Sequence, residues 1–164
     1  MALRKILTDA EPALHKVCKP VTAFDKKLHT LLDDMRETRI DSNGGGLAAP
    51  QVGILRRVVL VDTGEEIIEL INPELLETSG EQEGAEGCLS VPGKYGWVKR
   101  PYYSTVRAQD RHGNWFEAEG EELIARCFCH ELDHLDGILY TEVMEQAPAL
   151  CRFHFDRPRP SSRH

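Results

Sequence analysis

Two histidines and a glutamate late in the chain have the spacing of a metal site. Residues 130–134 read His-Glu-Leu-Asp-His, an H-E-x-x-H pattern. Because an α-helix turns once in about 3.6 residues, His130 and His134 would lie one turn apart on one face, where two imidazoles can bind one metal ion. Leu123 and Cys127 continue this stripe, which predicts that the histidines lie on the buried side of the helix. The alternative is that both are ordinary core or surface residues.

A catalytic metal site usually has three protein ligands and one position left for water, so a third ligand is needed. Residues 135–138, Leu-Asp-Gly-Ile, offer no further histidine. Cys88 follows a glycine and precedes a predicted strand, where the backbone can present a thiolate to a cleft. Cys127 lies one turn before His130 and can approach the same metal, although a helical cysteine more often packs as a small hydrophobe. Cys129 points about 100 degrees away from His130, so the spacing favours Cys88 and leaves Cys127 open.

Two helices are predicted around these residues. From Asp25 to Ile40, apolar residues recur at three- and four-residue spacing, which indicates an amphipathic helix with Asp25 as its N-cap. That helix ends at residues 43–46, Asn-Gly-Gly-Gly, where glycine allows backbone angles closed to other residues. The second helix, which carries the H-E-x-x-H motif, is expected to open at residues 120–122, Gly-Glu-Glu, and to close at Gly137.

Short β-branched and alternating runs predict two hairpins. The first joins Arg57–Val61 to Ile67–Ile71 across a turn-like Asp-Thr-Gly segment. The second joins Tyr103–Gln109 to Trp115–Ala118. Together with the two helices, these hairpins predict an α+β fold with mainly antiparallel sheets.

The length of 164 residues fits one domain, which we place at residues 1–146. Residues 147–164 are rich in proline and arginine and have no sustained periodicity, so we expect a disordered tail. The alternative to a disordered tail is a segment that contacts an RNA or a protein surface through Phe153, Phe155 and the arginines.

Composition and charge exclude several classes of protein. A net charge of −7 and a pI near 5.5 disfavour a protein whose main partner is a nucleic-acid backbone. The first dozen residues include an acidic residue and a proline and lack the apolar run of a secretory signal. No stretch approaches the roughly 18 consecutive apolar residues that span a bilayer. Five cysteines, an odd number, suit a reducing cytosol better than a secreted disulfide framework, so we expect a cytoplasmic location.

Three segments in this order resemble the ordered motifs of peptide deformylases. They are residues 44–51 (Gly-Gly-Gly-Leu-Ala-Ala-Pro-Gln), residues 86–90 (Glu-Gly-Cys-Leu-Ser) and residues 130–137 (His-Glu-Leu-Asp-His-Leu-Asp-Gly). Leu14, the Pro20-Val21 pair and the helix after them are also similar, and the resemblance covers about residues 3 to 145. It implies the deformylase fold, in which antiparallel sheets surround a central metal-bearing helix. It also implies the activity: removal of the formyl group from the N-terminal formyl-methionine of newly synthesised proteins, with release of formate.

The resemblance also implies the roles of individual residues. The metal ligands would be Cys88, His130 and His134. Glu131 would act as the general acid and base, and Gln51 with the backbone N–H of Leu89 would bind the developing oxyanion. Substrate contacts are assigned to Gly44, Gly45, Gly46, Glu86 and Cys127. Of these, Gly46 would let an extended peptide approach the backbone closely.

A cysteine and two histidines can bind zinc, iron, nickel or cobalt. The resemblance implies one divalent metal ion per chain, which is Fe²⁺ in the cell and often Zn²⁺ in purified protein. The expected partners are N-formyl-methionyl nascent peptides near the ribosome, with neither a membrane nor a specific nucleic acid. We expect a monomer or a weak oligomer.

Three departures from the family pattern are visible. Gly45 stands where family members usually carry a bulky apolar residue, and Cys129 stands where glutamine is common, so a hydrogen bond behind the ligands is lost or replaced. Many bacterial members end in a long helix used at the ribosome, whereas this chain is rich in proline and arginine after Pro148, so we do not expect ribosome docking by that route. Two rival functions are an H-E-x-x-H endopeptidase and a non-catalytic module whose metal holds the fold.

Overall fold

The computed structural model describes residues 2–145. In chain order the elements are η1 (Pro12–His15), α1 (Lys26–Ser42), β1 (Gly46–Ala48), η2 (Ala49–Val52), β2 (Val58–Asp62), β3 (Ile67–Ser79), β4 (Gln82–Cys88), β5 (Val91–Arg100), β6 (Tyr103–Gln109), β7 (Trp115–Glu121), α2 (Leu123–Leu135) and α3 (Tyr140–Val143). Five strands form one antiparallel sheet in the order β1-β2-β3-β6-β7, and β4 and β5 form a second, two-stranded sheet.

The five-stranded sheet lies between the two long helices. Successive side chains of a strand point to opposite faces, and residues 58–61 of β2 are apolar without a break. Val58 and Leu60 therefore join the cluster that α1 covers, whereas Val59 and Val61 join the cluster under α2. All four side chains are buried, so β2 belongs to both halves of the core.

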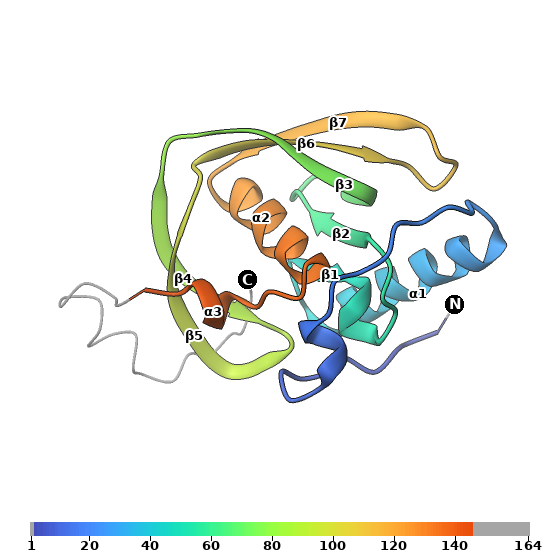
Figure 1. Cartoon of the computed structure of the whole chain (residues 1–164), viewed down its shortest axis with the longest axis horizontal. Coiled ribbons are helices and arrows are strands. Elements are labelled where there is room, and N and C mark those ends of the chain that lie inside the picture. The colour runs from blue at the N-terminus through green and yellow to red at the C-terminus, as the bar shows by residue number, and fades with distance from the viewer. Residues whose placement is uncertain (1, 146–164) are drawn as a thin grey trace.

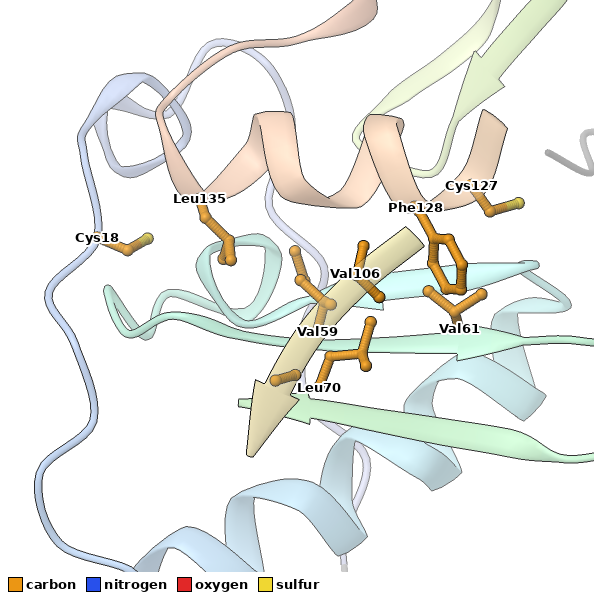
Figure 2. Close-up of a cluster of buried hydrophobic side chains, with 10 residues drawn as sticks. Cys18, Val59, Val61, Leu70, Val106, Cys127, Phe128 and Leu135 are labelled. Atoms are coloured by element: carbon orange, nitrogen blue, oxygen red, sulfur yellow. The ribbon is translucent and has the colours of Figure 1, made fainter. Parts of the chain in front are cut away.

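Figure 2 shows how α2 sits on the sheet. Phe128 and Leu135 point from the helix toward the strands, where Val59, Val61 and Val106 meet them. This apolar contact fixes the height and rotation of α2, because the buried surface stabilises only one placement of the helix against the sheet. In Figure 1, α2 is the central orange helix, and the β4–β5 ribbon wraps around its other side.

Most elements agree with their predictions. Helix α1 begins after Asp25, whose carboxylate accepts a hydrogen bond from the backbone N–H of Leu28 at 3.1 Å. Asn43, in the left-handed conformation, caps its other end. Both predicted hairpins are confirmed as antiparallel pairs, β2 with β3 and β6 with β7. Strand β3 continues to Ser79, beyond the predicted end at Ile71, with register irregularities along its pairing with β6.

The start of the second helix was predicted wrongly. Gly120 and Glu121 belong to β7, where they pair with β6, and α2 begins at Leu123 after Glu122. Leu123 was expected on the buried face but is 62% exposed, because it stands on the first turn, before the helix passes beneath the other elements.

Within residues 2–145, no helix is both long and apolar enough to cross a membrane. The predicted boundary at residue 146 and the predicted tail, residues 147–164, lie outside the described part of the chain. The proposal that residues 1–146 form one catalytic domain is supported by the shared core of the two helices and the sheet.

Gly137 anchors the end of α2 against the N-terminal segment. Its φ is +75°, and a Cβ there would lie 2.6 Å from the carbonyl carbon of His15. We expect Gly137→Ala to lower the free energy of unfolding by about 3 kcal/mol, from left-handed strain and from overlap. Gly93→Ala is the matched control, since Gly93 has φ +77° with open space around it and should show only the strain of about 1 kcal/mol. Equal losses in urea unfolding of the two variants would contradict this packing.

Candidate metal centre

Helix α2 carries two imidazoles and a carboxylate into the interior. The ring centroids of His130 and His134 lie 5.0 Å apart, and both rings are buried, as is Glu131. Tyr140, at the start of α3, stacks on His130 with 6.2 Å between the ring centroids. The prediction that the two histidines share one buried helix face is therefore confirmed.

Cys88 reaches these histidines from the end of β4. The pairing of β4 with β5 becomes irregular between Glu86 and Cys88, and the chain then turns at residues 89–90. The Sγ atom of Cys88 lies 3.3 Å from Nε2 of His134, a residue 46 positions later in the chain. One ligand atom from each of Cys88, His130 and His134 lies within 4.8 Å of the other two.

This donor set fits a divalent metal ion. With sulfur at about 2.3 Å and nitrogen at about 2.0 Å from a tetrahedral ion, the two donors would be about 3.5 Å apart. The observed 3.3 Å between Cys88 and His134 is close to that value. Three protein donors also leave one coordination position open, as in catalytic rather than structural sites.

The ionisation of the cysteines separates Cys88 from the other candidate ligands. Burial raises the pKa of the Cys88 thiol, but electrostatic interaction with His134 and hydrogen bonds from both imidazoles outweigh burial and hold the pKa well below its usual value. Burial raises the pKa of Cys127 to about 12 and that of Cys129 to about 11. Neither of these two sulfurs belongs to the converging donor group, and both remain thiols at neutral pH.

Glu86 fixes the ring of His130. Its Oε1 lies 2.8 Å from Nδ1 of His130, and a carboxylate only accepts, so Nδ1 donates and Nε2 is the ring nitrogen available to a metal ion. Two guanidinium groups, from Arg100 and Arg126, also donate to this carboxylate. Burial acts to raise the pKa of Glu86, but hydrogen bonds from His130 and Arg100 hold it well below its usual range. Sequence analysis assigned Glu86 to the substrate, whereas the structure directs its carboxylate to these three internal partners.

Gln51 lies behind the sulfur in a fixed orientation. Its Oε1 accepts from the backbone N–H of Ala48 at 2.9 Å, so its amide nitrogen faces the other way. That nitrogen donates to the hydroxyl of Ser90 at 3.0 Å and lies 3.6 Å from Sγ of Cys88. The amide is thus held next to the candidate metal position, and Leu89 follows directly after Cys88.

Two glycines let the three motifs approach one another. A Cβ on Gly44 would lie 2.6 Å from Cδ1 of Leu89, and a Cβ on Gly46 would lie 2.7 Å from Oε2 of Glu131. Gly46 opens β1, the edge strand of the five-stranded sheet. Glycine at position 46 therefore brings the backbone of an edge strand into contact with the carboxylate of Glu131.

A cavity of about 440 Å³ lies beside the glycine segment. Its walls include Gly44, Gly45 and Cys127, three of the residues assigned to the substrate, and the exposed Leu123. Arg39 adds a polar wall, where its guanidinium donates to the carbonyl of Gly44 at 2.8 Å. The cavity combines apolar and polar surfaces next to the edge strand.

Sequence reasoning missed three residues of this centre: Ser90, Arg100 and Arg126. Ser90 lies within the second motif but received no role. Arg126 stands four residues before His130, as His130 stands four before His134. The same helical spacing therefore predicts that Arg126 lies on the face of the two histidines. Arg100 ends a strand far from the motifs in sequence, and no local pattern points to it.

Comparison with known proteins identifies the family. The family model described as polypeptide deformylase matches residues 3–148. The chain is 58% identical over 147 residues to a peptide deformylase of Agathobacter rectalis, covering 90% of this chain and 93% of that protein. This chain belongs to the peptide deformylase family. A second member, from Alkaliphilus metalliredigens, is 53% identical over 142 residues, covering 87% and 97% of the two chains.

Solved peptide deformylase structures have the same fold. The crystal structure from Legionella pneumophila is 44% identical, with a TM-score of 0.85 over 96% of this chain and 93% of that chain. The structure from Thermotoga maritima is 38% identical, with a TM-score of 0.87 over 89% of this chain and 100% of that chain. The predicted fold class, α+β with antiparallel sheets around a central helix, is therefore confirmed, and that helix carries two of the three candidate metal ligands. Like other peptide deformylases, the chain is a metal-dependent hydrolase that removes the N-formyl group from nascent peptides.

Gly46 tests the contact between the edge strand and Glu131. In Gly46→Ala the new methyl group would displace the carboxylate of Glu131 or press on the carbonyl of Leu60, 2.9 Å away. Because displacement of a reacting group by about 1 Å can cost about 100-fold in rate, we expect deformylation to fall by about that factor. Metal content, measured by elemental analysis, should stay at the wild-type level. Wild-type activity in this variant would show that Glu131 is not held against this strand.

Proposed function

We propose that Cys88, His130 and His134 bind one divalent metal ion at which this deformylase hydrolyses the formyl amide. The observation that carries the proposal is the convergence of the three donor atoms within 4.8 Å of one another, from two segments far apart in sequence. A metal-dependent family, a thiolate at Cys88 and a pre-oriented His130 support the same ligand set.

Glu131 is the proposed general acid and base. A divalent metal ion held by these residues would supply the acidity that makes water nucleophilic near neutral pH. Glu131 is adjacent to His130 in sequence and buried, so its carboxylate can take a proton from the attacking water and return it to the departing amine. Gly46 keeps the carboxylate beside the edge strand along which a substrate peptide would lie.

Gln51 and the backbone N–H of Leu89 are the proposed donors to the oxyanion. The amide nitrogen of Gln51 is already directed toward Cys88, because its oxygen is engaged by Ala48. A donor fixed before the reaction needs no reorganisation when charge develops, and one such donor is worth about 3 kcal/mol.

The edge strand and the cavity are the proposed substrate site. A formyl-methionyl peptide can add to β1 by backbone hydrogen bonding, since β1 is an edge of the sheet. The 440 Å³ cavity beside Gly44, Gly45 and Cys127 has apolar surface for a side chain such as methionine. Peptide deformylases of Acinetobacter baumannii and Synechococcus elongatus have been solved with actinonin bound, and we propose that actinonin binds this chain at the same centre.

Ferrous iron is the proposed metal in the cell, with zinc, nickel or cobalt accepted by the same ligands. The proposed setting is the cytoplasm, where N-formyl-methionyl nascent peptides leave the ribosome, with the protein as a monomer or a weak oligomer. An acidic chain, with a net charge of −7, supports a peptide rather than a nucleic-acid substrate.

Glu131→Gln separates catalysis from metal binding. We expect release of formate from formyl-Met-Ala-Ser to fall by about 100-fold or more, because the amide cannot accept the proton, while metal content stays unchanged. Glu117→Gln, at an exposed position on β7, is the matched control and should retain wild-type turnover.

Two outcomes would contradict the proposal. Full activity of Glu131→Gln would remove this residue from the mechanism. Cleavage of internal peptide bonds by the wild-type protein, with formyl-Met-Ala-Ser left intact, would make the chain an endopeptidase instead.

A further inference from the structure

We propose that Arg126 is a positioning residue for deformylation: it holds Glu86, and through Glu86 both His130 and the end of β4, in register with helix α2. This inference rests on the proposed ligand set of Cys88, His130 and His134. It adds a residue that touches neither metal nor substrate and acts through the carboxylate of Glu86.

Four hydrogen bonds saturate the carboxylate of Glu86. Oε1 accepts from Nη2 of Arg100 at 3.0 Å and lies 2.8 Å from Nδ1 of His130. Oε2 accepts from Nε of Arg100 at 2.9 Å and from Nη1 of Arg126 at 2.7 Å. A carboxylate offers about four acceptor positions, and all four are used. Because Glu86 is buried, loss of Arg126 would leave one acceptor position of its carboxylate without a hydrogen bond. An unsatisfied buried acceptor destabilises the folded protein.

Arg126 and His130 both hydrogen-bond to Glu86, from two successive turns of one helix. They are four residues apart, and His134 follows after four more, so all three lie along one face of α2. Glu86 therefore contacts the helix at two points about one turn apart, which resists sliding of β4 along the helix axis. Arg100 adds an indirect link, since it comes from β5 and also bonds Asp133 of α2 at 2.8 Å, but only Arg126 and His130 join Glu86 to the helix directly.

Strand β4 matches this helix face step by step. Two residues of strand advance about 6.7 Å, and four residues of helix advance about 6 Å. Gly84 meets Arg126, Glu86 meets His130, and Cys88 meets His134. A Cβ on Gly84 would lie 3.1 Å from Nη2 of Arg126, so at the first step of this register a glycine lies in close contact with a guanidinium. The contact of Gly84 with Arg126 therefore helps to set where Cys88, four residues further along β4, lies relative to His134.

The pairing also explains how Arg126 remains in the interior. Its side chain is 10% exposed, and within residues 2–145 it forms one ion pair, with the carboxylate of Glu86. Arg100 and Asp133 complete a group of two positive and two negative side chains. A buried charge without such a partner is strongly destabilising, so Arg126 and Glu86 depend on each other.

Metal release tests the inference directly. The protein is loaded with Co²⁺, and transfer of the metal to a chelator is followed by absorbance, together with kcat and KM for formyl-Met-Ala-Ser. We expect Arg126→Met to release metal at least 10-fold faster and to lower kcat by a similar factor with little change in KM, as for other groups that support metal ligands. Arg126→Lys should recover part of both effects, because it restores a positive donor.

Arg36→Met is the matched control. Arg36 also pairs with a carboxylate, that of Glu69, but this pair joins α1 to β3, which carry none of the proposed ligands, so its loss should leave metal release unchanged. In a Glu86→Gln background, Arg126→Met should have no further effect on release. Wild-type release in Arg126→Met, or an undiminished effect in the Glu86→Gln background, would overturn the inference.

A second variant applies if Arg126→Met does not fold. Gly84→Ala keeps the charge and pushes on the guanidinium by a few tenths of an ångström, and it should speed metal release in the same direction. Unchanged release in Gly84→Ala would then refute the register. Failure of the ligand set itself would look different: the Co²⁺-loaded wild type would lack the charge-transfer absorption of a cobalt–thiolate bond.

Discussion

The ion pairs at Glu86 are the interaction on which the centre depends. They join three elements, since Glu86 lies on β4, Arg100 on β5, and Arg126 and His130 on α2. The two-stranded sheet is separate from the larger one, and these buried bonds attach it to the helix. Removing one member of such a buried pair typically costs about 3–5 kcal/mol. The same contacts that hold the small sheet in place therefore set the distance from Cys88 to the histidines.

In the proposed mechanism, this attachment matters because each group with a chemical role is fixed before the substrate binds. The orientation of His130 depends on Glu86 and on stacking by Tyr140, and the amide of Gln51 is held by Ala48 and Ser90. Fixed donors and a fixed base reduce the reorganisation needed in the transition state. The glycine segment contributes in another way: without side chains it lets an edge strand approach the carboxylate of Glu131 and the side chain of Leu89.

The sequence predicted those parts of the molecule that local patterns encode. Periodicity located α1, both hairpins and the face shared by His130 and His134, and the ordered motifs pointed to the fold and to Cys88. The N-terminus of α2 was misplaced, because residues 120 and 121 have the acidic and glycine signals of a helix start but pair with β6. Arg100 and the role of Glu86 were beyond reach, since their partners come from three elements and the contact depends on how these pack. Arg126 was within reach of the four-residue stripe and was missed.

The central claim is that one sulfur from β4 and two imidazoles from α2 share a metal ion. X-ray absorption at the iron edge of anaerobically purified protein measures those donors directly. The account predicts one sulfur and two imidazole nitrogens, with lighter atoms from solvent completing the coordination shell. A shell without sulfur, or one closed by four protein ligands, would contradict it.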